Sequence, residues 1–168
     1  MPSLADDLRT APTTFRPFRP DPVQPAALRR AAERARLAPW RLVAVTNPGT
    51  RLAIRDAHLP HWRAHLADSG GTRILADDRP ALVARDLRAA DAFALQLHEA
   101  PVHLVLLAKQ HAPLRASAVG ELRAALHAEH LDAAPLPLAS RAAPELCDLL
   151  RIPEDLTVAG VLVTRSRR

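Results

Sequence analysis

The sequence lacks several features that would define a function at once. Its 168 residues include one cysteine, Cys147, so no internal disulfide can form, which is typical of a reducing compartment. It has five glycines, none spaced as in the G-x-G-x-x-G loop that cradles dinucleotide phosphates. It has no apolar run long enough to cross a bilayer, and its acidic N-terminus lacks a signal-peptide core. We therefore expect a cytoplasmic protein without a membrane partner.

Aromatic residues are also scarce, and tyrosine is absent. Since 48% of the residues are hydrophobic, the core must consist mostly of Leu, Val, Ala and Ile. The net charge of +5 comes almost entirely from arginine, because Lys109 is the only lysine. The arginines are interspersed with acids at helical spacing, as in RDLRAAD at 85–91, and form no block of like charge. This pattern favours a solvated surface, and we expect no nucleic-acid partner.

Two groups of residues have spacings that metal or nucleophile chemistry uses. In HLPHWRAH, His61 and His65 lie one helical turn apart, but Pro60 is expected to disrupt the turn that holds His58. A zinc or iron site needs three or four ligands whose orientation is held by further hydrogen bonds, so a polar helix face is the simpler interpretation. Cys147 occupies an apolar helical position, which favours a small core residue over a nucleophile. We expect no metal.

Apolar periodicity and turn signals predict interleaved helices and strands. Helices are expected at 3–9, 25–37, 50–67 with a break near Pro60, 80–97, 115–130 and 144–150. Strands are expected at 41–46, 102–108 and 157–164, with short extended segments at 73–75 and 133–138. No linker is long enough to separate two domains, so we expect a single domain over 1–168, a sandwich of helices around one sheet.

The segment TTFRPFRPDPV at 13–23 sets three prolines and two arginines ahead of the first long helix. In one interpretation it is an anion site, because the hydroxyls of Thr13 and Thr14 and the guanidinium of Arg16 can hold a phosphate. In the other it is a stiff strap, in which Phe15 and Phe18 pack and the arginines are solvated. The sequence leaves both interpretations open. We call residues 13–23 the strap.

Four segments resemble, in order, the nitroreductase family of flavin enzymes. They are FRPDPVQPAALRRAAERARLAPWRLVAVTNPGTR (18–51), HEAPVHLVLLA (98–108), AVGELRAALHAEHLDA (118–133) and LCDLLRIPEDLTVAGVLV (146–163). The resemblance implies a nitroreductase-like α+β sandwich with a central, mainly antiparallel sheet flanked by helices. It also implies a homodimer that binds FMN at the subunit interface. In such a dimer, electrons pass from NAD(P)H to nitroaromatics, quinones or other small acceptors.

The first half of the chain keeps only part of the flavin contacts that the resemblance implies. The family's R-S-x-R falls on residues 13–16, with Thr13 for the first arginine, Thr14 for the serine and Arg16 retained. The family's polar S-x-x-N-x-Q loop is absent, so Pro39 runs directly into Trp40. The amide contacts that this loop provides to the flavin ring are therefore missing.

The second half departs from the family at three places. The paired amides of the central helix read Gly120 and Glu121, and a glycine that follows this helix reads His130. Arg165 stands where the family has a glycine after the last strand, and the family's C-terminal segment with its phosphate-binding arginine is not present. The cofactor-binding residues that the resemblance implies are Thr13, Thr14, Arg16, Trp40 and Arg165, and it indicates no catalytic residue.

We therefore expect a shortened, divergent, FMN-dependent NAD(P)H oxidoreductase with a degraded flavin site. The alternative is a flavin-free binding or structural protein with the same fold. The helix at 115–130 carries the apolar stripe Ala118, Leu122, Ala125 and Leu126. If this stripe is uncovered, it forms the interface of a two-fold homodimer. The competing interpretation is a monomer in which residues 50–67 cover the stripe.

Overall fold

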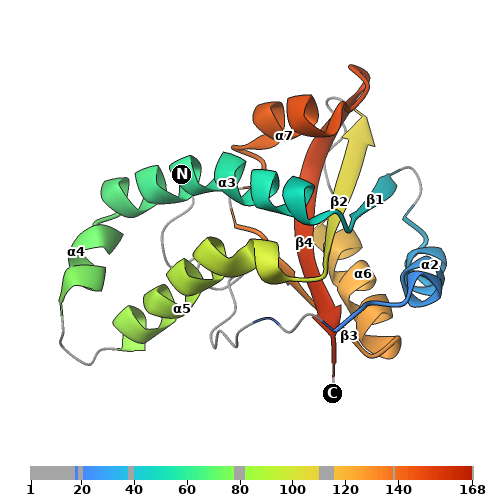
Figure 1. Cartoon of the computed structure of the whole chain (residues 1–168), viewed down its shortest axis with the longest axis horizontal. Coiled ribbons are helices and arrows are strands. Elements are labelled where there is room, and N and C mark those ends of the chain that lie inside the picture. The colour runs from blue at the N-terminus through green and yellow to red at the C-terminus, as the bar shows by residue number, and fades with distance from the viewer. Residues whose placement is uncertain are drawn as a thin grey trace.

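A computed structural model describes residues 18, 21–37, 40–77, 82–109, 116–137 and 139–167 (Figure 1). Four strands form one sheet in the order β1-β2-β4-β3, and every neighbouring pair is antiparallel. The strands are β1 (Arg41–Val45), β2 (Val102–Lys109), β3 (Leu131–Pro135) and β4 (Leu156–Ser166). The central strand β2 is buried along almost its whole length, which explains why its sequence is continuously apolar.

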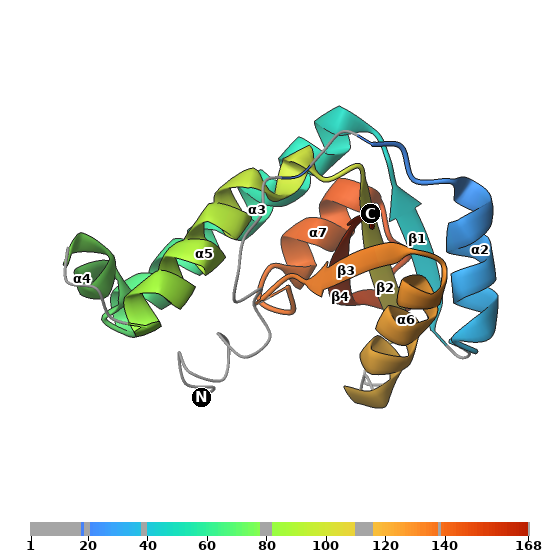
Figure 2. The same ribbon diagram turned by 90° about the horizontal axis from the view of Figure 1, so that it is seen from below.

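One face of the sheet is covered by α2 (Pro25–Arg34) and α6 (Ala116–Ala128) (Figure 2). Pro25 fits the first turn of α2, where its missing N–H has no helical partner in any case. Alternate strand residues such as Leu104, Leu106 and Leu162 pack against the two helices. Glu129, just past α6, accepts a hydrogen bond of 2.9 Å from Arg30 Nε and so ties the two helices together.

The other face is covered by the first half of α3 (Pro48–Asp68), by the 3-10 turn η1 (Leu97–Glu99) and by α7 (Ala143–Leu150). The Asn47 side chain caps α3, because its Oδ1 accepts a 3.0 Å hydrogen bond from the Thr50 backbone N–H. Ile54 of α3 and Leu146 of α7 are fully buried in this layer together with Val105 of β2. The central strand β2 is therefore buried on both faces, whereas three of the five residues of the edge strand β1 are exposed.

The second half of α3 extends away from the sheet together with α4 (Gly71–Ala76) and α5 (Leu82–Gln96), as Figures 1 and 2 show. We call the second half of α3, together with α4 and α5, the arm. The arm has its own small core, in which Trp62 and Leu66 pack with Leu87 and Ala90. Trp62 Nε1 donates a 2.9 Å hydrogen bond to Asp91 Oδ1, which fixes α3 against α5.

The structure confirms the predicted α+β sandwich, and the strands and most of the helices lie within a few residues of their predicted bounds. The helix expected at 3–9 lies outside the described residues. Within the part of the chain that the structure describes, no helix combines the length and apolarity needed to span a bilayer.

Two local predictions were wrong. Pro60 does not break its helix, and α3 runs without interruption from Pro48 to Asp68. Pro60 and Asp56, four residues earlier, are both exposed, so water can solvate the carbonyl that loses its helical partner. The strand expected at 73–75 is part of the helix α4, because its short apolar run packs Ile74 and Leu75 against the arm.

Candidate functional site

The strap is anchored on the arm through Phe18. The ring of Phe18 lies 6.0 Å, centroid to centroid, from the ring of Phe93 on α5, at a tilt of 49°. Phe18 also packs against the core layer that holds α3 and α7. The interpretation of Phe18 as an anchor is therefore confirmed. Phe15, Thr13, Thr14 and Arg16 lie outside the described residues.

The strap then reaches the end of β4. Ser166 Oγ, in the last position of β4, donates a 3.3 Å hydrogen bond to the carbonyl of Pro22. The next residue, Arg167, donates its backbone N–H to the carbonyl of His130 at 2.7 Å. Strap, β4 and the turn after α6 thus meet at one end of the sheet, which we call the strap end.

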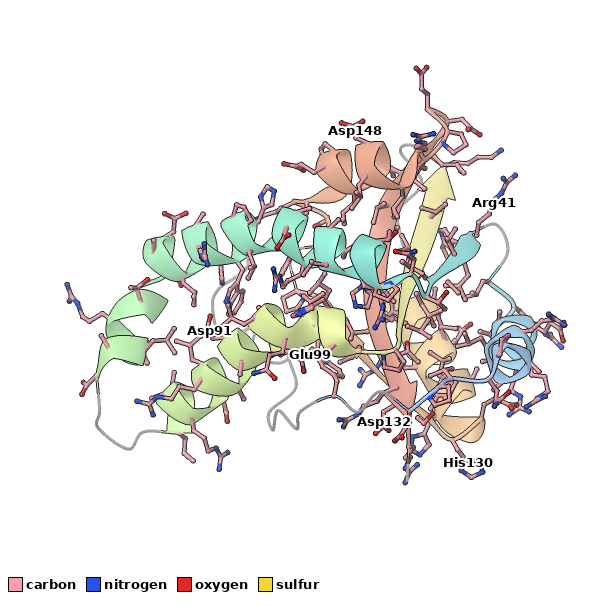
Figure 3. All side chains as sticks on the ribbon, viewed as in Figure 1. Arg41, Asp91, Glu99, His130, Asp132 and Asp148 are labelled. Atoms are coloured by element: carbon pink, nitrogen blue, oxygen red, sulfur yellow. The ribbon has the colours of Figure 1, made fainter. Side chains whose placement is uncertain are left out.

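Arg165 lies at the strap end and faces a carboxylate. It pairs across the ladder with Asp132 of β3, and its Nη2 lies 3.7 Å from Asp132 Oδ2. The Arg165 side chain is 30% exposed, so it is reachable from solvent, and the acid offsets part of its charge. Arg167 Nη1 contacts the ring of His127 on α6. Figure 3 shows Asp132 and His130 at this end of the molecule.

Trp40 lies at the opposite end of the sheet. It directly precedes β1, whose first residue Arg41 pairs with Leu107. Arg165 instead follows Thr164, which pairs with Val102 at the other end of β2. The two positions are separated by about seven residues of strand, or roughly 20 Å. Figure 3 accordingly shows Arg41 and Asp132 at opposite ends. The structure does not bring Trp40 and Arg165 together within one chain.

The residues that replace the family's helix amides and glycine have clear local settings. Gly120 and Glu121 are both exposed on α6, and a Cβ built on Gly120 would meet nothing within 4 Å. His130 has φ 58°, so it holds the left-handed conformation that glycine adopts without strain. A histidine there is strained, and its ring is exposed.

A buried polar cluster lies beneath the strap end, and the sequence alone did not indicate it. Arg51 of α3 donates from Nη1 to the carbonyls of His98, at 3.1 Å, and Ala100. His103 of β2 is fully buried, and its Nε2 donates to the Leu97 carbonyl at 2.8 Å. These bonds fix the connection between α5 and β2. The sequence did contain one signal for this cluster, which is the histidine inside the otherwise apolar run VHLVLLA.

Two histidines are held neutral by their burial. Burial lowers the pKa of His103 to about 4, although the hydrogen bond that its ring donates to the Leu97 carbonyl acts in the opposite direction. Burial, helped by the charge of His61, lowers the pKa of His58 on α3 to about 4. Among the described residues, neither ring nitrogen of His58 has a hydrogen-bond partner. Both rings are therefore uncharged at pH 7.

The three histidines of HLPHWRAH lie in different surroundings. His58 is buried in the interior, while His61 Nε2 lies 3.2 Å from Glu145 on α7. His65 is buried, with its ring 6.0 Å from that of Trp62. Within the described ranges, no group of three His, Cys, Asp or Glu residues could hold a metal ion.

The apolar stripe of α6 is not an open patch, so that expectation was wrong. Ala118, Leu122, Ala125 and Leu126 are all at most 4% exposed, and the last three pack against α2 and the sheet. Residues 50–67 do not cover the stripe, as the competing interpretation expected, because they belong to α3, whose first half packs on the opposite face of the sheet. The stripe therefore builds the core of one chain.

Comparison with known proteins places this geometry in a recognised fold. No family model matches the sequence, and no curated protein matches it significantly. Solved structures do match: a BluB-like flavoprotein from Clostridium difficile 630 has a TM-score of 0.63 at 12% identity, covering 100% of this chain and 91% of that one. The FMN-dependent nitroreductase NfnB from Mycobacterium smegmatis, in complex with NADPH, has a TM-score of 0.61 at 20% identity, covering 97% and 87%.

A third similar structure is iodotyrosine deiodinase bound to FMN and 3-iodo-L-tyrosine, with a TM-score of 0.61 at 20% identity, covering 98% of this chain and 90% of that one. All three neighbours span nearly the whole of this chain. The chain therefore has the nitroreductase-like fold that the sequence resemblance implied.

Proposed function

We propose that the chain is an FMN-dependent oxidoreductase that takes electrons from NAD(P)H and delivers them to a small acceptor, through a degraded flavin site. The observation that carries the proposal is the junction of strap and β4, where Ser166 Oγ meets the Pro22 carbonyl at 3.3 Å. This junction gathers hydroxyl and guanidinium donors at one exposed end of a fold whose solved neighbours include FMN-dependent nitroreductases.

The donors at the strap end suit the phosphate of FMN. Arg165 offers a guanidinium that is 30% exposed, and Ser166, which follows it in β4, carries a hydroxyl on the opposite face of the strand that holds the Pro22 carbonyl of the strap. Arg16 is separated from the anchored Phe18 by one residue, and Thr13 and Thr14 precede it. Guanidinium and hydroxyl groups are the donors that phosphate binding uses. Bound FMN would supply the hydride chemistry, while these residues would hold its phosphate.

Asp132 weakens this site. Its carboxylate lies 3.7 Å from Arg165 and competes with a phosphate for the same guanidinium. We therefore expect Asp132→Asn to raise the affinity for FMN several-fold. Asp86→Asn is the matched control, because it also removes an acid from an exposed ion pair, with Arg85 on α5. If both variants bind FMN like the wild type, Arg165 does not hold the phosphate.

We further propose that the flavin site is completed in a homodimer. Trp40 and Arg165 lie roughly 20 Å apart at opposite ends of one sheet, so they are not neighbours in a site formed by one chain alone. In a two-fold dimer, the Trp40 end of one copy can face the strap end of the other. This arrangement agrees with the subunit-interface site that the resemblance implies.

A mixing experiment tests the composite site. Trp40→Ala and Arg165→Ala are each expected to abolish FMN reduction by NAD(P)H when they are the only chain present. Mixed in equal amounts after partial denaturation, they should recover about a quarter of the wild-type sites, because half of the dimers then carry one intact site. No recovery, from dimers shown to have exchanged, would mean that one chain supplies both residues to a site, and it would refute the composite arrangement.

The second candidate function is a flavin-free binding protein with this fold. It is favoured by one observation, the ion pair of Arg165 with Asp132, which satisfies the cation without any cofactor. Purified protein decides between the two candidates. A yellow protein, or one that turns yellow and stays so after incubation with FMN and gel filtration, supports the oxidoreductase. A protein that remains colourless after incubation supports the flavin-free candidate.

A further inference from the structure

An open pocket of about 720 Å³ runs along α7, at the end of the sheet opposite the strap end. Its volume lies within the range of small-molecule sites. One wall is the face of α7 and of the turn before it, from Ser140 past Cys147 to Asp148. The other wall is the turn at 152–154 with the first residues of β4. Trp40 lies toward the same end of the sheet, but neither Trp40 nor Arg165 lines the pocket.

The described lining of the pocket combines apolar residues with two acids. Its apolar residues include Ile152 and Leu156, and the half-buried Cys147 lines it too. The two charged residues of the described lining are Asp148 and Glu154, and both are acids. The described lining therefore offers apolar side chains together with two carboxylates.

The helix itself adds to this negative charge. Asp148 lies in the last turn of α7, whose carbonyls at Asp148 and Cys147 accept hydrogen bonds from the backbone N–H groups of Arg151 and Ile152, at the negative end of the helix dipole. A helix dipole disfavours an acid at that place, so the local field favours a cation near the end of α7. Two basic residues are close in the chain or the sheet: Arg151 follows α7, and Lys109 pairs with Leu156. Neither of them lines the pocket.

We propose that this pocket binds a small organic cation with an apolar body. The body would lie along α7, which is about 12 Å long, against Ile152 and Leu156. An ammonium group at one end would face Asp148 and Glu154. This binding does not depend on the flavin site, and it would persist in a protein that binds no FMN.

Cys147 makes the proposal directly measurable, because it is the only cysteine in the chain and lines the pocket. The probes are 4-phenylbutylamine, its neutral analogue 4-phenylbutanol and its anionic analogue 4-phenylbutyrate. The readout is the rate at which iodoacetamide, an uncharged reagent, alkylates Cys147. We expect the ammonium to slow alkylation by about threefold or more, the alcohol to slow it less and the carboxylate to leave it unchanged.

Charge variants separate the pocket from a general effect of net charge. Asp148→Asn with Glu154→Gln should raise the apparent Kd of the ammonium by about tenfold. The matched control is Asp68→Asn with Glu99→Gln, two exposed acids outside the pocket, and it should behave like the wild type. Lys109→Met should strengthen binding, because it removes a competing cation.

Several results would overturn the proposal. These are the absence of protection by the ammonium, equal protection by all three probes, and protection that survives the loss of both acids. The comparison of the three probes uses the wild-type protein, so it decides the question even if a variant fails to fold. Far-UV circular dichroism of each variant excludes unfolding as the cause of a changed rate.

Discussion

Acid should destabilise this protein. Two buried histidines determine how steeply its free energy of unfolding falls as the pH falls. His58 and His103 are fully buried, and burial lowers the pKa of each to about 4. In the unfolded chain the same groups titrate at about 6.5. As the pH falls below about 6.5, the unfolded state therefore takes up a proton on each ring, while the folded state does not.

The size of the effect follows from proton linkage. The free energy of unfolding changes by about 1.4 kcal/mol per pH unit for each proton by which the two states differ. The two histidines together therefore give a slope that approaches about 2.7 kcal/mol per pH unit between pH 6.5 and 4. Their contribution is fully present above pH 6.5, falls with the pH through this window, and stops changing once the folded rings also protonate near pH 4.

Urea unfolding followed by far-UV circular dichroism at pH 7.5, 6.5, 5.5 and 5.0 measures this slope. His58→Leu should halve it, because leucine has no titratable group and His58 loses no hydrogen bond among the described residues. The matched control His127→Leu, at an exposed position of α6, should leave the slope unchanged. A wild-type slope near zero between pH 6.5 and 5.0, or a slope that His58→Leu does not change, would refute the reasoning.

Three other substitutions have definite expected results. His130→Gly should raise the free energy of unfolding by up to about 1 kcal/mol, since glycine adopts φ 58° without strain, and a lower thermal midpoint would contradict this. Phe18→Ala should destabilise the chain by about 1–2 kcal/mol and speed proteolysis within the strap, and unchanged cleavage would mean that Phe18 is no anchor. Leu122→Glu should unfold the chain, because the Leu122 side chain is fully buried. If the variant instead stays folded but becomes monomeric, the α6 stripe is a dimer interface after all.

The fold was largely predictable because each strand and most helices have a clear hydrophobic period. The apolar run at 102–108 could only be a buried strand, and the structure makes it the centre of the sheet. The helix at 25–37 was equally clear from its stripe, and Leu28, Ala31 and Ala35 are buried there. The predictions failed where a local signal depends on its surroundings. Pro60 is tolerated because it faces water, and Ile74 and Leu75 are helical because the arm provides a core for them.

The candidate site was less predictable, because a site depends on which ends of which elements meet. The sequence grouped Trp40 with Arg165 through resemblance, whereas the antiparallel ladder separates them along β2. It also offered the α6 stripe as an exposed interface, since a stripe of small apolar residues looks the same whether its own chain or a partner covers it. The pairing of Arg165 with Asp132 requires the register of β3 on β4, which no local pattern encodes.

An FMN titration, followed by quenching of flavin fluorescence, tests the central claim most directly. The account predicts saturable binding to the wild-type protein, weaker binding by Arg165→Ala and stronger binding by Asp132→Asn, with light scattering giving twice the 18.3 kDa chain mass. Fluorescence that stays unquenched at an excess of wild-type protein would contradict the claim and leave a flavin-free protein with a nitroreductase-like fold.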